Sequence, residues 1–119
     1  GVSKVGILAT EGTIRTGLLQ KAFAHRGITS VMPDWANQRR VMDIIYRHVK
    51  AGRPVDAIAF AQVSDGLWQK GCQQILLGCT ELSVVRDELH LDSRYLDVFL
   101  QKKGYTHKVV ATVLQLLFF

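Results

Sequence analysis

The sequence predicts an α/β domain in three layers, with a short parallel sheet of about four strands flanked by helices. Short apolar runs end in polar turns, and the longer segments between them carry apolar residues at helical spacing. Strands that alternate with helices in this way form parallel sheets covered on both faces. The length of 119 residues and the hydrophobic content of 48% fit one domain with a small core.

The strands are expected at three apolar runs, residues 4–9, 28–32 and 74–77. Pro33 stops the second of them. Residues 95–100 allow two interpretations, a fourth strand or the start of a helix.

Three amphipathic helices are expected between these runs. The first covers residues 13–25, with Thr13 as its cap and Gly27 just beyond its end. The second carries an apolar stripe over residues 41–49, after a polar loop at 34–38. The pattern predicts a third helix from about residue 58 to residue 70, and a charged loop at residues 87–92.

Charge and composition exclude several classes of protein. The net charge of +5 is scattered, without zinc-ligand spacing or a long Lys/Arg run, so we expect no nucleic-acid partner and no metal. The apolar run 109–119 contains Gln115 and is too short to span a membrane. Cys72 and Cys79 are too few for a disulfide scaffold. We therefore expect a cytoplasmic protein with free thiols and no membrane partner.

Residues 78–81, Gly-Cys-Thr-Glu, directly follow the third predicted strand. Gly78 permits a tight turn, and a helix beginning at Thr80 would point free N–H groups at Cys79 and favour its thiolate. A thiolate is a good base or nucleophile; Thr80 offers a hydroxyl to a substrate, and Glu81 can orient a neighbouring group. Spacing supports equally well the alternative that Cys79 is a small buried apolar residue.

The turn after the first predicted strand offers backbone N–H groups and the hydroxyls of Thr10 and Thr13 to a carboxylate or phosphate. The alternative is an ordinary helix cap at Thr13, which needs no ligand. Because right-handed crossovers bring the turns after strands one and three to the same edge, we expect this turn to lie near residues 78–81.

Two further residues have simple structural explanations. Lys50 ends the second predicted helix, where its charge stabilises the helix C-terminus without any ligand. Cys72 precedes the third strand, away from the carboxyl edge, so burial or a surface position without a chemical role is expected.

Taken together, these motifs resemble the aspartate/glutamate racemase superfamily. Residues 4–13 (KVGILATEGT) resemble the opening of that family's second domain, with its Ala-Thr-x-x-Thr signature, and residues 75–82 (ILLGCTEL) resemble its second cysteine motif. Residues 44–52 (IIYRHVKAG) are similar to the helix between them. The resemblance covers about residues 3–97. Glu81 indicates the aspartate racemase branch, because the glutamate branch typically has His after Cys-Thr.

The resemblance implies a flavodoxin-like half of a two-domain, cofactor-independent amino-acid racemase, with aspartate as substrate. In that family one cysteine removes the α-proton and a second cysteine, from the other domain, delivers a proton to the opposite face. Carried over, Cys79 is one of the two thiols, and the substrate-binding residues are Thr10, Thr13, Thr80, Glu81 and Lys50.

The resemblance also implies what else the site requires. The partners are a small amino-acid or dicarboxylate substrate and a missing first racemase domain or second subunit, so the chain alone is expected to be inactive. We expect residues 1–98 to form the racemase second-half domain and residues 99–119 a divergent helical tail. The alternatives are another enzyme of the superfamily, such as a hydantoin racemase or maleate isomerase, or a non-catalytic domain that binds a small carboxylate or a partner chain.

Overall fold

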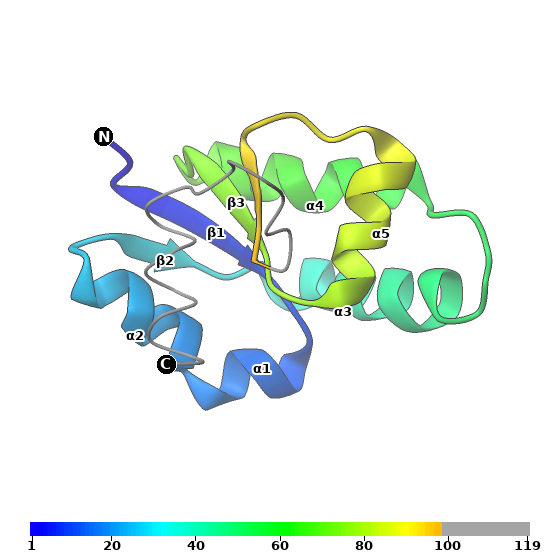
Figure 1. The fold of residues 1–119 in the computed structure, drawn as a ribbon, viewed down its shortest axis with the longest axis horizontal. Helices are drawn as coiled ribbons and strands as arrows, with labels where there is room; N and C mark the ends of the chain where they lie inside the picture. Colours follow the sequence, from blue (N-terminus) through cyan, green and yellow to red (C-terminus); the bar gives the residue numbers. More distant parts are fainter. Residues whose placement is uncertain (99–119) are drawn as a thin grey trace.

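The computed structural model describes residues 1–98, and their centre is one parallel sheet of four strands in the order β2-β1-β3-β4 (Figure 1). Both central strands are apolar and buried along most of their length, as expected where helices cover both faces. The predicted α/β class is confirmed, and the ambiguous segment after residue 94 begins as a strand. The predicted tail at residues 99–119 lies outside the described residues. The strands are β1 (Lys4–Leu8), β2 (Thr29–Val31), β3 (Gln74–Leu77) and β4 (Tyr95–Asp97).

Helices cover the sheet on both faces and give the predicted three layers (Figure 1). One apolar cluster joins β1, β3 and β4 to α2, which contributes Leu19 and Phe23. The other joins the opposite face to α3, η1, α4 and α5 through Leu8, Ile75 and Leu77. The helices are α1 (Glu11–Thr16), α2 (Leu18–His25), α3 (Trp35–Asp43), the π-helical turn η1 (Ile44–Val49), α4 (Ala57–Gln69) and α5 (Thr80–Leu89).

The strand order creates a switch point between β1 and β3. The chain leaves β1 for β2 on one side, and later crosses back to β3 on the other side of β1. Connections on either side of this point run over opposite faces of the sheet, so their loops diverge at the carboxyl ends of β1 and β3. In open α/β sheets ligands bind at this place.

The first predicted helix is in fact two helices. The prediction that Thr13 is the cap is wrong: the side chain of Thr10 accepts the hydrogen bond from the Thr13 N–H (3.2 Å), so the cap lies three residues earlier than expected and α1 begins at Glu11. Gly17 then adopts a left-handed conformation (φ 71°) and separates α1 from α2. Apolar spacing alone did not reveal this break, because the stripe resumes in α2.

The predicted polar loop at residues 34–38 is also wrong, because it is mostly the first turns of α3. Asp34 caps this helix by accepting a hydrogen bond from the Asn37 N–H (2.8 Å). Only Val41 of α3 is buried, so the helix lacks the apolar stripe from which it could have been recognised. The chain continues into η1, where the Lys50 N–H bonds to the Ile45 carbonyl five residues back (2.9 Å).

The remaining elements lie close to their predicted positions. The third helix is present as α4, capped by Asp56. The predicted charged loop at 87–92 is shorter than expected, since α5 continues to Leu89 and ends where His90 takes a left-handed conformation. Cys72 is buried beside the amino end of β3, as expected. Within residues 1–98 no helix is long and apolar enough to cross a membrane.

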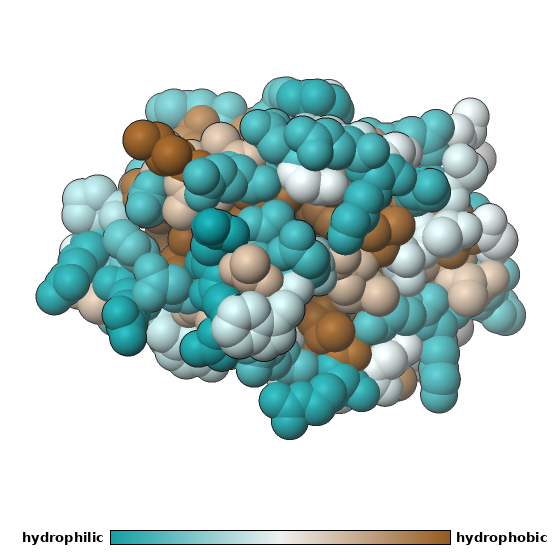
Figure 2. Space-filling model, turned by 180° about the vertical axis from the view of Figure 1, so that it is seen from behind, coloured by the Kyte–Doolittle hydropathy of each residue, from teal (hydrophilic) through white to brown (hydrophobic). Residues whose placement is uncertain are grey.

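The surface is largely polar on the face opposite to the view of Figure 1. Figure 2 shows hydrophobic residues there in small separate spots between hydrophilic ones. Scattered apolar residues of this kind are normal for a protein surface and do not by themselves mark an interface.

The α3 cap gives a test of this fold. We expect Asp34→Ala to lower the free energy of unfolding by about 1 kcal/mol, because the Asn37 N–H loses its acceptor. Asp34→Asn keeps an acceptor at the same position and should stay within about 0.3 kcal/mol of the parent. Urea unfolding followed by circular dichroism measures both values. Equal stability of the Ala variant and the parent would contradict the assigned start of α3.

Candidate functional site

The carboxyl ends of β1 and β3 are in direct contact. The Gly78 N–H donates to the Leu8 carbonyl (2.8 Å). A β-carbon at Gly78 would lie 3.1 Å from that carbonyl oxygen and 3.2 Å from the side chain of Ala9, so a larger residue would have to push these neighbours aside. Thr10 follows Ala9 and Cys79 follows Gly78. The two turns singled out from the sequence therefore meet at the edge of the sheet where they were expected.

Thr10 and Thr13 form a bonded pair of hydroxyls within this edge. Besides capping α1, Thr10 donates from Oγ1 to Oγ1 of Thr13 (3.1 Å). Both residues are half-buried. The turn does cap a helix, but through Thr10 and not through Thr13 as the capping alternative had it. Within the pair, the Thr10 proton is used and the Thr13 hydroxyl proton has no acceptor. Thr13 can therefore donate to an anion while its hydrogen bond with Thr10 holds the Thr13 hydroxyl in place.

Cys79 is the N-cap residue of α5 and is partly exposed. The pKa of its thiol is raised to about 11, mainly by burial and to a smaller extent by the nearby Glu81 carboxylate. The Leu82 and Glu81 N–H groups and the charge of Lys50 act in the opposite direction. The helix start predicted at Thr80 exists, but its N–H groups do not offset the loss of water around the sulfur. The expected thiolate is therefore not the form present at neutral pH.

Thr80 and Glu81 interact with each other in the first turn of α5. The exposed Thr80 donates from Oγ1 to Oε2 of Glu81 (3.0 Å). A hydroxyl has one proton, so Thr80 in this rotamer can only accept a hydrogen bond from a ligand and must turn away from Glu81 to bind a carboxylate.

Lys50 lies at the end of η1 and is exposed. Its ammonium group sits over the ring of Tyr46, 4.9 Å from the ring centroid. It lowers the pKa of Cys79, which places it within electrostatic reach of that thiol. Lys50 forms no ion pair with a carboxylate in residues 1–98, so its charge is available to an anion at this edge.

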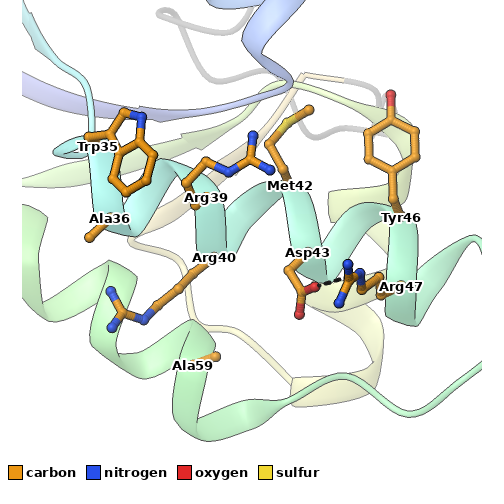
Figure 3. Close-up of a pocket in the computed structure, with 9 residues that line it drawn as sticks. All are labelled: Trp35, Ala36, Arg39, Arg40, Met42, Asp43, Tyr46, Arg47 and Ala59. Carbon is orange, nitrogen blue, oxygen red and sulfur yellow. Dashed lines mark ion pairs between the residues drawn. The ribbon is translucent and has the colours of Figure 1, made fainter.

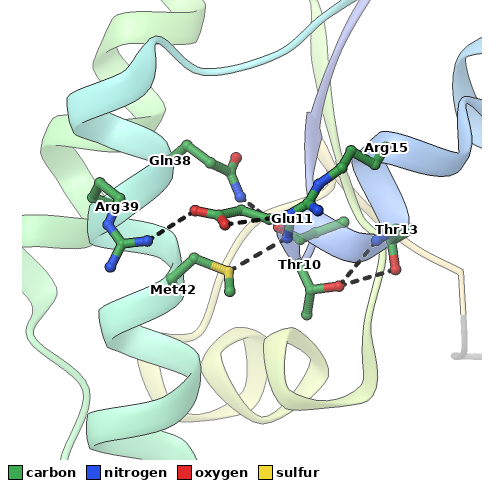
Figure 4. Close-up of polar contacts among 8 residues, drawn as sticks. Thr10, Glu11, Thr13, Arg15, Gln38, Arg39 and Met42 are labelled. Carbon is green, nitrogen blue, oxygen red and sulfur yellow. Dashed lines mark hydrogen bonds and ion pairs between the residues drawn. The ribbon is translucent and has the colours of Figure 1, made fainter.

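Sequence reasoning missed four residues that border the site. Gln38, Arg39 and Met42 reach from α3 to the turn after β1, as Figure 4 shows. No apolar stripe marked α3, so nothing indicated which way these side chains point. Asp97 ends β4 at the same edge, is 1% exposed and accepts a hydrogen bond from the Ser83 hydroxyl (2.9 Å). The signal for Asp97 was available: it is a lone acid at the end of an apolar strand.

An open groove of about 610 Å³ runs along α3 and η1 beside this edge (Figure 3). Trp35, Arg39, Met42 and Tyr46 project to one side of the helix, and a second row projects to the other side, toward Ala59 of α4. Among the described residues no group of three or more His, Cys, Asp or Glu side chains could hold a metal ion. The groups available for chemistry at the edge are one thiol, three threonine hydroxyls, the carboxylates of Glu81 and Asp97, and the ammonium group of Lys50.

Comparison with known proteins connects this arrangement to one family. Residues 2–100 match the model of the Asp/Glu/hydantoin racemase family. A relative described as "Uncharacterized protein in pnlA 3'region" from Pectobacterium carotovorum subsp. carotovorum is 36% identical over 87 residues, which are 72% of this chain and 57% of the relative.

A solved structure has the same fold. It is described as a "putative Asp/Glu Racemase from Yersinia pestis", and it superposes with a TM-score of 0.68 at 21% identity. The match covers 98% of this chain and 47% of that one. The chain thus spans about half the length of the proteins it matches.

The raised pKa of Cys79 predicts its alkylation profile. The rate with iodoacetamide should be low near neutral pH and should keep rising above pH 9 toward pH 11, since only the thiolate reacts. Cys72 is only 7% exposed, whereas Cys79 is partly exposed, so the reagent reaches Cys79 more easily and we expect Cys79 to be labelled first.

Mass spectrometry of tryptic peptides separates the two sites. Cys79→Ser and Cys72→Ser are the matched controls. Preferential labelling of Cys72, or a Cys79 rate that levels off below pH 8, would contradict the described environment of Cys79.

Proposed function

The chain belongs to the Asp/Glu/hydantoin racemase family, and from this premise we propose that it is one half of a cofactor-independent amino-acid racemase in which Cys79 is one of two thiol acid/bases. Aspartate is the proposed substrate. The other thiol would come from a second domain or subunit.

The observation that carries this proposal is the contact between the carboxyl ends of β1 and β3. Because Gly78 packs against the end of β1, the hydroxyl pair Thr10–Thr13 and the thiol of Cys79 share one edge of the sheet. A substrate α-carboxylate bound by the hydroxyls would hold its Cα near the sulfur. Proximity of this kind is what a weakly acidic C–H bond requires, since the base must be aligned with the bond.

The reaction needs a second protein surface on the opposite side of the substrate Cα, which we call the second wall. Racemisation removes a proton from one face of Cα and returns one to the opposite face, so two groups must flank the substrate. Cys72 cannot be the second group, because β3 lies between it and Cys79, and four strand residues span roughly 13 Å. The edge is also open to water, which weakens electrostatic stabilisation of a carbanion.

The raised pKa of Cys79 is compatible with a two-thiol mechanism. In each turnover one thiolate abstracts a proton while the other thiol, still protonated, donates one. A thiol whose pKa is about 11 serves as the donor in the resting enzyme. A second wall that brings another cation near Cys79 would lower its pKa and allow the reverse direction.

Charge at the edge supports a dicarboxylate. Lys50 provides a free ammonium group for a second carboxylate, on the η1 side of Cys79. Glu81 is the acid that could receive the substrate ammonium. An amino acid with two carboxylates and one ammonium group uses all three kinds of partner.

The raised pKa of Cys79 also favours a second candidate function, which is binding without catalysis. A domain whose only thiol at the edge stays protonated could bind a small carboxylate without turning it over. Binding alone does not separate this candidate from the racemase, but the reaction does.

We expect L-aspartate and succinate to bind weakly at Thr10, Thr13 and Thr80, with millimolar affinity because the edge is open. Titration followed by ¹H–¹⁵N NMR should shift the amide signals of these residues. The double change Thr10→Val, Thr80→Val should abolish the shifts, whereas Thr29→Val, at the far edge of the sheet, should leave them unchanged. Binding that survives the double change would rule out this site.

The 119-residue chain by itself should not racemise aspartate at a measurable rate, because it offers one thiol on one side of Cα. Incorporation of solvent deuterium at Cα of L- and D-aspartate, followed by NMR, checks this. A longer polypeptide that adds the second wall should racemise aspartate, and Cys79→Ala should abolish its activity while leaving aspartate binding intact. Cys79-dependent exchange by the short chain would show that no second wall is needed; an active long form of Cys79→Ala would refute the proposed role of Cys79.

A further inference from the structure

Helix α3 holds the turn after β1 on both sides of Thr10. The Gln38 side-chain amide donates to the Ala9 carbonyl (2.9 Å), just before Thr10. The Glu11 N–H, just after it, donates to the sulfur of Met42 (3.4 Å). Figure 4 shows both contacts arriving from the same helix. The backbone of Thr10 is therefore fixed from outside its own turn.

An ion-pair bridge strengthens this attachment. The Glu11 carboxylate pairs with Arg39 of α3 (3.0 Å) and with Arg15 of α1 (3.7 Å) (Figure 4). Each pair is exposed and contributes little by itself. Through these two pairs Glu11 connects α1 to α3.

The continuation of α3 carries the ammonium group of the site. In η1 the hydrogen bonds run five residues back, as in the bond from the Lys50 N–H to Ile45, and π-helical turns of this kind occur often at functional sites. Tyr46 lies one turn before Lys50, and its ring contacts the Lys50 ammonium group at 4.9 Å. A cation over the face of an aromatic ring is attracted by the ring electrons, so this contact favours one position of the ammonium group. Tyr46 is 49% exposed, so about half of its surface contributes nothing to the core.

We propose that α3 together with η1 is the positioning element of the site. Gln38 and Met42 fix the turn that contains Thr10, and Tyr46 fixes Lys50. Because all three residues lie on one continuous helix, that helix sets the separation between the two carboxylate-binding groups, the Thr10 turn and Lys50. Gln38, Met42 and Tyr46 are positioning residues, since they act through Thr10 and Lys50. That the ligand is a dicarboxylate rests on the proposed function, whereas the contacts of α3 and η1 do not depend on it. The consequence is selectivity for ligand length: a helix that holds both groups favours one spacing of carboxylates over others.

The first test needs no ligand and concerns the Thr10 turn. Gln38→Leu removes the donor to Ala9 with little change in size. Amide hydrogen exchange at residues 10–13 should become about fivefold faster, which corresponds to the loss of one hydrogen bond. Arg47→Ala, on the other row of the same helix, is the matched control and should leave these amides unchanged. Equal exchange in the two variants would overturn the role of Gln38.

The second test concerns Tyr46 and also needs no ligand. The charged groups that act on Cys79 are Lys50 from η1 and Glu81 from α5, together with the N–H groups of the first turn of α5. If Tyr46 holds Lys50 in place, Tyr46→Ala should move the alkylation profile of Cys79 to higher pH, in the same direction as Lys50→Met. The double variant should shift no further than Lys50→Met alone, and Tyr46→Phe should retain the parent profile. Additive shifts, or no shift in Tyr46→Ala, would overturn the role of Tyr46.

The third measurement separates this proposal from the proposed function. Succinate and glutarate titrations of the parent and of Tyr46→Ala give the ratio of the two dissociation constants. The parent should prefer one of the two lengths by about threefold or more, and Tyr46→Ala should reduce that preference, because an unrestrained Lys50 tolerates either spacing. If the parent binds neither ligand, the proposed function fails, while hydrogen exchange and alkylation still decide whether α3 and η1 position the two groups. A parent that binds both lengths equally would overturn the claim of length selectivity.

Discussion

The close approach of β1 and β3 at their carboxyl ends is the constraint on which the rest of the site depends. A side chain larger than hydrogen at position 78 would press on the Leu8 carbonyl and the Ala9 side chain, so glycine lets the two strand ends touch without displacing either of them. β1 and β3 are neighbours in the sheet although they are far apart in the sequence, and the strand order reverses between them. The loops that follow the two strands therefore diverge from the point where the strand ends touch. The turns bearing Thr10 and Cys79 start from this one contact.

Electrostatics at the edge follows from burial more than from helix geometry. Cys79 has the favourable position at a helix start, and N–H groups do stabilise its thiolate, yet desolvation dominates and raises its pKa. The cation that could reverse this balance, Lys50, is exposed and screened by water. A site of this kind changes its protonation when a second surface excludes that water or adds charge.

Helix α3 shows how a polar helix can matter more to a site than an amphipathic one. Its buried contribution to the core is a single residue, Val41, but its polar side chains reach the backbone on either side of Thr10. Hydrogen bonds to a loop backbone stabilise one conformation of that loop, whereas apolar contacts tolerate small shifts. The π-helical continuation then carries Tyr46 and Lys50 toward the same edge.

The sequence by itself determined the class of the fold, its strands and the motifs at their ends. Buried strands covered on both faces are uniformly apolar, so residues 4–8 and 74–77 could be recognised without knowing their partners, and the Gly-Cys-Thr-Glu turn could be placed at an edge from the handedness of crossovers alone. Only the tertiary structure decided how the edge is built. Capping by Thr10 and Asp34 depends on which backbone N–H group faces the side chain. The break between α1 and α2 depends on the local dihedral angle of Gly17. The protonation of Cys79 and the attachment of the Thr10 turn to α3 depend on neighbours far away in the chain. Those neighbours exclude water from the thiol, and the extent of this burial cannot be predicted from a local sequence pattern.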